Sequence, residues 1–159
     1  MLAHAAVTPF PWPDVIIIVG LIVLNGVFAM SELAIVSAKS ARLRAKRDRG
    51  SGSAQVALQL AADPGKFLST VQIGITLVGI IAGAYSGASL GGPVGERLAA
   101  LGVPAEWAGD SGFALVIALT TYFSLVVGEL VPKQLALRHA VPIALVMARP
   151  MALIARVAA

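Results

Sequence analysis

Three long apolar segments constrain this chain more than any other feature of its sequence. The first covers about residues 15–38 and contains one charged residue, Glu32. The second covers about residues 67–90 without any charge, and the third covers about residues 112–131 with only Glu129. A helix of about 20 apolar residues crosses the hydrocarbon core of a bilayer. Because lipid offers no partner for a free backbone amide, each segment is expected to be helical.

The composition agrees with a membrane domain. Of the 159 residues, 58% are hydrophobic and 13% are charged, whereas a soluble domain carries about 25% charged residues. There is no cysteine, which excludes disulfides, thiolate metal sites and thiol catalysis. The sequence also lacks a phosphate-binding loop and a zinc-protease motif. We therefore predict one all-α integral membrane domain over residues 1–159, with three transmembrane helices and no enzymatic activity.

The charges between the apolar segments predict the orientation of the domain. The first connection and the C-terminal stretch carry nearly all the basic residues, and the second connection carries only Arg97. Basic loops favour the cytoplasmic side, so the C-terminus is predicted inside and the N-terminus outside a plasma membrane. Trp12 and Trp107 fall at the predicted outer boundary, where indole rings favour the headgroup layer. The basic residues are not interleaved with stacking aromatics, so nucleic acid is not an expected partner.

Two stretches outside the spans have the pattern of juxtamembrane helices. Residues 40–62 read as two short helices on the inner leaflet, and residues 134–158 read as an interfacial amphipathic helix. Pro142 and Pro150 are expected to break or kink the second stretch. A fourth span is the alternative there, but Arg149 lies near its middle, and a central arginine is costly in lipid.

A glycine repeat predicts close helix packing in the second span. Gly79, Gly83, Gly87 and Gly91 recur at every fourth position and share one helical face. Their partner is either another span of this chain or a second copy. Since three helices do not easily enclose a pathway, we expect a homodimer.

The two intramembrane carboxylates are the candidate functional groups, because such groups usually face a polar cavity or a partner. Glu129 precedes Pro132, which cannot donate an amide hydrogen and clashes with the carbonyl of Gly128. We therefore expect that carbonyl to be free beside the Glu129 carboxylate. Such oxygens suit Mg²⁺ or another hard cation. The alternative is a kinked helix end from which Glu129 reaches the cytoplasmic headgroups.

Polar atoms of the other spans could complete this site. The candidate ligands are Asn25 and Ser31 in the first span and Thr76 in the second. Gln72 in the second span and Thr120 and Ser124 in the third are further polar residues. A serine or threonine hydroxyl is more often bonded to a carbonyl of its own helix, and Asn25 has the alternative of a hydrogen bond between helices.

Three stretches of this sequence resemble the transmembrane domain of the CorC/cyclin-M family, the hemolysin-like magnesium transporters. They are Met30–Ala34, Phe67–Gly79 and Gly128–Lys133. The resemblance implies a homodimer with three spans per subunit, a belt of juxtamembrane helices, and Mg²⁺ bound in each subunit by Glu129 and the Gly128 backbone, with Ser31 as the first-span hydroxyl. It also implies cytoplasmic CBS domains beyond this chain, efflux-type transport and Na⁺ as a coupling ion.

One departure from the family pattern keeps a second substrate open. Many members have an asparagine in the second span where this chain has Ile75 and Thr76, so Thr76 is the available substitute ligand. Relatives that share the Gln-Ile-Gly-Ile-Thr pattern are linked to polyamine export. The hypotheses are therefore Mg²⁺ transport, polyamine export, and a non-transporting membrane anchor for a cytoplasmic regulatory domain.

Overall fold

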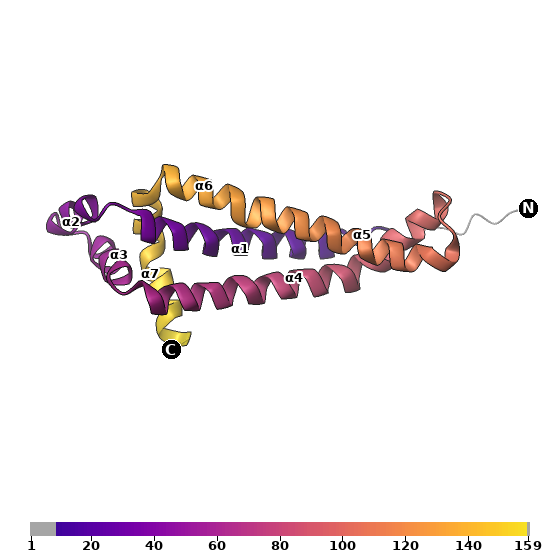
Figure 1. The fold of residues 1–159 in the computed structure, drawn as a ribbon, viewed down its shortest axis with the longest axis horizontal. Coiled ribbons are helices and arrows are strands. Elements are labelled where there is room, and N and C mark those ends of the chain that lie inside the picture. The colour runs from indigo at the N-terminus through magenta and orange to yellow at the C-terminus, as the bar shows by residue number, and fades with distance from the viewer. Residues whose placement is uncertain (1–8, 159) are drawn as a thin grey trace, which may run out of the picture.

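The computed structural model describes residues 9–158, which form helices joined by short connections and no strand (Figure 1). The elements, in chain order, are α1 (Trp12–Ser37), α2 (Ser40–Asp48), α3 (Gly52–Ala62), α4 (Pro64–Ala100), α5 (Ala105–Leu125), the π-helix η1 (Val126–Leu130), α6 (Val131–Arg138) and α7 (Ala140–Ala158). Helices α1 and α4 and the continuous run α5–η1–α6 lie side by side, and α7 crosses one end of this bundle (Figure 1).

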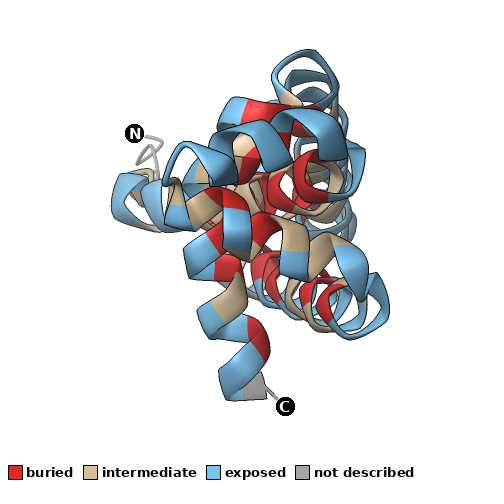
Figure 2. Cartoon of the chain, turned by 90° about the vertical axis from the view of Figure 1, so that its left-hand side faces the viewer, coloured by how far each residue is buried: buried red, intermediate tan, exposed pale blue. Residues whose placement is uncertain are grey.

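Four helices in the described range are long and apolar enough to cross a membrane, judged by length and composition. Three of them correspond to the three predicted spans: Trp12–Ser37, Pro64–Ala100 and Ala105–Arg138. The fourth, Ala140–Val157, was predicted to be interfacial. The sequence therefore predicted three spanning helices, one fewer than the number of helices that meet this criterion. This helix lies across the bundle in both Figure 1 and Figure 2, and not alongside the other three. The all-α membrane class is confirmed.

The two ends of the bundle differ in charge. We call the end formed by α2, α3, α6, α7 and the first turn of α4 the basic end, since these segments and their connections hold eleven of the twelve basic residues; Arg97 is the exception. The opposite end, which we call the far end, contains the α4–α5 connection. Trp12 and Trp107, at the starts of α1 and α5, are 64% and 67% exposed there.

Residues 40–62 form the two short helices that the sequence predicted, α2 and α3. Gly50 separates them with a φ of 96°, a left-handed conformation that glycine adopts without steric cost. The hydroxyl oxygen of Ser51 then accepts a hydrogen bond from the Ala54 amide at 3.2 Å, which caps α3. Leu43 of α2 is fully buried with Ile35 of α1, so the connection is folded onto the bundle.

The third spanning helix continues through Pro132, where the sequence predicted its end. The reason is the π-helix η1, in which the Val131 amide donates to the carbonyl of Val126, five residues earlier. Pro132 then falls in the first turn of α6, a position that suits the fixed φ of proline, although the Gly128 carbonyl is left without a helical donor. The wider turn thus absorbs the proline, and the helical path reaches Arg138.

Helix α7 is also continuous, contrary to the expected break. Pro142 lies in its first turn and Pro150 inside it. Ala144, Ala148 and Met151 recur on the buried face, which packs against α1 and α3. Arg149 and Arg156 are exposed, so the helix is amphipathic as predicted.

A packed core joins the helices at the basic end. Phe67, Ile35, Leu43 and Val71 are the largest apolar side chains that are fully buried, and they come from α4, α1 and α2. Figure 2 looks onto this end and shows the buried residues on faces that the helices turn toward one another. This core fixes α1 and α4 in register next to Glu32.

The four glycines of the repeat in α4 have two different structural roles. A Cβ on Gly87 would lie 2.7 Å from the Phe113 ring, and one on Gly91 would lie 3.5 Å from the Phe113 Cα atom, which confirms packing against α5. A Cβ on Gly79 or Gly83 would meet nothing within 4 Å. These two glycines instead leave space beside α1 and α5.

Candidate functional site

Helix α1 and the π-helix are in close contact halfway along the bundle. A Cβ on Gly26 would lie 3.0 Å from Pro132 Cγ, and a Cβ on Gly128 would lie 3.4 Å from the Ile22 carbonyl oxygen. Glycine at both positions therefore permits the backbones to approach. Asn25 Nδ2 donates a hydrogen bond to the Gly128 carbonyl oxygen at 3.3 Å.

This hydrogen bond corrects the prediction of a free Gly128 carbonyl. Pro132 has no amide hydrogen to offer that oxygen, and the side chain of Asn25 supplies a donor in its place. The inter-helix hydrogen bond that was the alternative role of Asn25 is therefore present. Its consequence is a fixed orientation of the Asn25 amide group.

The other atom of the same amide has no partner. Asn25 is 5% exposed, and its Oδ1 forms no hydrogen bond with the described residues. An unsatisfied buried acceptor costs about 1–3 kcal/mol, and such groups call for a physical explanation. A bound cation or the water that it carries would satisfy this oxygen.

A cavity of about 170 Å³, which we call the central cavity, lies beside Asn25. Helices α1, α4, α5 and η1 all contribute to its wall: Asn25, Ile75, Gly79, Gly83, Thr120, Thr121, Ser124, Leu125 and Glu129. Five of these residues carry side-chain oxygens. The two glycines on α4 add no side chain to the wall, and they keep the cavity open.

The π-helix accounts for the third-span part of this wall. Thr120 and Ser124 are four residues apart and share a helical face, whereas Glu129 follows after five residues. The wide turn of η1 compensates for the extra residue, so the Glu129 carboxylate lies on the same side as the hydroxyls. Glu129 is half-buried and forms no ion pair with a described residue.

The structure brings together part of the predicted ligand set. Glu129 and Asn25 line the central cavity, and Gly128 is bonded to Asn25 at its edge. Ser31 is fully buried, and its hydroxyl donates to the Val27 carbonyl of its own helix at 2.6 Å. Thr76 lines a different cavity. Thr121 was missed, although it lies three residues before Ser124 in α5, a spacing that places both hydroxyls on one helical face.

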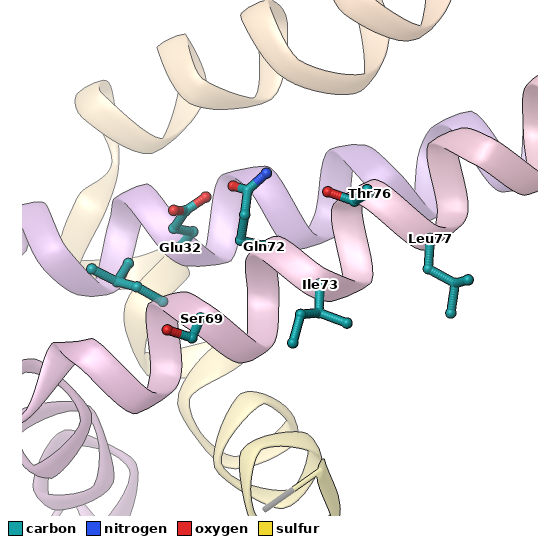
Figure 3. Close-up of a pocket in the computed structure, with 7 residues that line it drawn as sticks. Glu32, Ser69, Gln72, Ile73, Thr76 and Leu77 are labelled. Atoms are coloured by element: carbon teal, nitrogen blue, oxygen red, sulfur yellow. The ribbon is translucent and has the colours of Figure 1, made fainter.

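The second cavity, of about 660 Å³, lies between α1 and α4 toward the basic end. We call it the Glu32 groove, and its lining residues are Glu32, Leu68, Ser69, Gln72, Ile73, Thr76 and Leu77. Figure 3 shows Glu32, Gln72 and Thr76 projecting the same way from the two helices, while Ile73 and Leu77 project to the other side. One carboxylate, one amide and two hydroxyls thus meet in a wide groove.

A third cavity, of about 470 Å³, is apolar and lies on the far-end side of the central cavity. Its walls include Ile18, Val94 and Phe123, and it shares Thr120 with the central cavity. The polar groups therefore continue from the central cavity toward the basic end. Toward the far end, the side chains next to the central cavity are mostly apolar.

The arrangement permits cation binding with few charges. Over residues 9–158 there is no group of three or more histidine, cysteine or acidic residues that could hold a metal ion. A cation in the central cavity would meet one carboxylate, one amide oxygen and hydroxyl oxygens. Mg²⁺ sites use one or two carboxylates and retain several waters, so this donor set fits that ion.

Comparison with known proteins assigns the chain to one family. Residues 16–159 match the model described as the cyclin M transmembrane N-terminal domain. The UPF0053 protein sll0260 of Synechocystis is 48% identical over 87% of this chain and 31% of its own length. The UPF0053 protein YhdT of Bacillus subtilis is 36% identical over 88% of this chain and 31% of its own. The polyamine export protein of Escherichia coli is 32% identical over 48% of this chain and 17% of its own. The chain thus spans about a third of the length of the first two relatives.

Proposed function

This chain belongs to the cyclin M transmembrane domain family, as its resemblance predicted, and on that premise we propose that it transports Mg²⁺ through the central cavity. The observation that carries the proposal is the buried, unpartnered Oδ1 of Asn25 in a cavity that also holds Glu129. Multiple spanning helices make the chain a multi-pass membrane protein. A buried acceptor next to a carboxylate favours a cation over an anion or an apolar ligand.

The ion would be held by the oxygens that line the central cavity. Mg²⁺ requires near-octahedral oxygen coordination at about 2.0–2.1 Å. The donors are the Glu129 carboxylate, Asn25 Oδ1, and the hydroxyls of Thr120, Thr121 and Ser124, with water completing the shell. The Gly128 carbonyl acts through Asn25, because its hydrogen bond orients the amide. Ser31 is left out of the proposed set because it does not line the central cavity; its hydroxyl hydrogen is donated to the Val27 carbonyl.

The proposed orientation of the domain rests on the distribution of charge, and the proposed direction of transport is export. The basic end is proposed to be cytoplasmic in the plasma membrane, with the N-terminus outside, by the preference of lysine and arginine loops. The polar groups between the basic end and the central cavity offer a cation a route from the cytoplasm. Export with Na⁺ as the coupling ion completes this proposal.

A second copy of the chain is the proposed partner within the membrane. Gln72 and Thr76 of α4 and Thr121 of α5 are exposed in a single copy. Polar groups facing lipid are unfavourable, and helix association buries them. A homodimer would cover this side of the bundle while leaving the basic end open. The remaining length of the relatives is proposed to correspond to cytoplasmic CBS domains here.

Polyamine export is the second candidate function, carried by the Glu32 groove. The lining of this groove combines the Glu32 carboxylate with the apolar side chains of Leu68, Ile73 and Leu77, which suits an elongated amine with an apolar chain, and one relative is named a polyamine export protein. Competition between putrescine and Mg²⁺ for the purified protein separates the two functions. A membrane anchor without transport is the third candidate, and the absence of any cation flux would favour it.

The test of Mg²⁺ transport is flux into proteoliposomes that contain a fluorescent Mg²⁺ indicator. Glu129→Gln keeps the shape of the side chain and removes its charge, so flux should fall by about tenfold or more. Glu106→Gln is the matched control, because Glu106 is exposed in the first turn of α5 and outside the central cavity. Equal flux for both variants and the unaltered protein would remove Glu129 from the pathway.

A further inference from the structure

We propose that the Glu32 groove is a second cation site, which binds Mg²⁺ with its water shell intact before the ion enters the central cavity. This inference rests on the proposed function, since it assigns the groove a step on the same route. The Glu32 side chain is half-buried inside a spanning helix and forms no ion pair with a residue in the described range. A carboxylate placed in this way is costly unless it serves a polar pathway.

The groove and the central cavity lie along one face of α4. Gln72 and Thr76 line the groove, and Gly79 and Gly83 line the cavity. These four positions recur at intervals of four, three and four residues, which is the spacing of one helical face. A cation that leaves the groove along this face therefore reaches the cavity directly.

The same order holds on α1. Asn25 lines the central cavity, and Glu32 lies two turns closer to the basic end on the same face. Seven residues of helix correspond to a displacement of about 10 Å along the axis. The carboxylates of Glu32 and Glu129 therefore belong to two successive cation sites along the route, and each site can hold its own ion.

The sizes of the two cavities indicate different states of the ion. The groove is a wide depression of about 660 Å³ that is largely open to the surroundings, and the central cavity, of about 170 Å³, is more enclosed. Mg²⁺ gives up its waters reluctantly, so a wide site can bind it through those waters. The Glu32 carboxylate, the Gln72 amide oxygen and the Thr76 hydroxyl are acceptors for the hydrogens of such waters, and the carboxylate attracts the ion electrostatically.

The alternative of a packing role for Glu32 does not account for this environment. Its neighbour Ser31 is fully buried and bonded to its own helix, whereas Glu32 forms no hydrogen bond with a described residue. The groove beside it has polar groups from both helices, and Figure 3 shows Glu32, Gln72 and Thr76 directed to the same side. A position that served packing alone would be filled by an apolar side chain.

Hexaamminecobalt(III) tests the inference because it has the octahedral shape of hydrated Mg²⁺ and ligands that do not exchange. Its binding to the purified protein in lipid nanodiscs is measured by calorimetry, together with its displacement by Mg²⁺. We expect Glu32→Gln to weaken its binding by about tenfold and Glu32→Asp to retain most of it. Glu106→Gln is the control for charge alone.

Two results would overturn the inference. One is unchanged hexaamminecobalt(III) binding in Glu32→Gln, and the other is displacement by putrescine but not by Mg²⁺, which would make the groove an amine site. Failure of the proposed function looks different: Mg²⁺ flux would then persist in Glu129→Gln, whatever Glu32→Gln does to hexaamminecobalt(III).

Discussion

The side-chain amide of Asn25 joins two helices, because its Nδ2 donates to the Gly128 carbonyl at 3.3 Å while its Oδ1 stays buried without a partner. The donor half replaces the hydrogen bond that Pro132 cannot make. The same hydrogen bond fixes the orientation of Asn25 Oδ1, which lies in the cavity that Glu129 also lines. One residue thus connects the unusual backbone of the third span to the candidate ion site.

Replacing Asn25 should impair Mg²⁺ binding more than replacing its buried neighbour Ser31. Asn25→Ala removes one oxygen ligand and the donor to Gly128, so we expect affinity to fall by about tenfold. Ser31→Ala removes a hydroxyl that is already bonded to Val27 and should change affinity less than about twofold. Calorimetric titration of both variants with Mg²⁺ gives the comparison. A larger loss in Ser31→Ala would restore Ser31 as the ligand.

Filling the central cavity should stop transport without unfolding the protein. A Cβ at Gly79 has open space around it, so Gly79→Leu places its side chain in the cavity. Removing a helical glycine also stabilises the helix by about 0.5–1 kcal/mol. Gly92→Leu is the control, since Gly92 is on the same helix with equally open space and does not line the cavity. Flux and melting temperature are measured on both. Normal flux in Gly79→Leu would place the route elsewhere.

Close contact between α4 and α5 should make Gly112 sensitive to a single methyl group. A Cβ on Gly112 would lie 2.6 Å from the Gly95 Cα atom, so Gly112→Ala must push the helices apart at a cost of about 1–3 kcal/mol. Gly109→Ala is the matched control, because a Cβ there meets nothing within 4 Å. Thermal unfolding followed by circular dichroism should show a lower midpoint only for Gly112→Ala. Equal midpoints would mean that the helices separate freely at this point.

The sequence predicted the spans well because hydropathy reports the segments that contact lipid. The second and third helices extend beyond the predicted ends of their spans: α4 continues from residue 90 to Ala100 through residues such as Glu96 that are compatible with a helix but not with the lipid interior. The amphipathic α7 was anticipated from the spacing of its arginines. Its continuity through Pro150 was not, because tolerance of a proline depends on how the backbone around it adjusts.

The ligand set was predicted in part, for a geometric reason. Residue type identified Glu129 and Asn25, but adjacent residues on a helix point about 100° apart. Whether Ser31 or Glu32 faces a cavity is therefore set by packing between helices. Thr76 and Ile75 show the same effect, since Ile75 lines the central cavity and Thr76 the Glu32 groove.

Pro132 should be required for transport although no part of it lines the central cavity. In Pro132→Ala, the new amide can donate to the Gly128 carbonyl and complete an ordinary α-helical hydrogen bond. That bond competes with the hydrogen bond from Asn25. It also favours an ordinary α-helical turn over the π-helical turn at Val126–Leu130. Without the π-turn, the five-residue step from Ser124 to Glu129 no longer keeps both groups on one face. We therefore expect loss of Mg²⁺ flux with an unchanged or higher melting temperature.

Pro150→Ala is the matched control for this effect, because Pro150 also lies within a helix but in α7, away from both cavities. Its flux should equal that of the unaltered protein. If Pro132→Ala transports normally, the π-turn is maintained by the Asn25–Gly128 contact and the close packing of Gly26, and the proline is then a consequence of that geometry and not its cause.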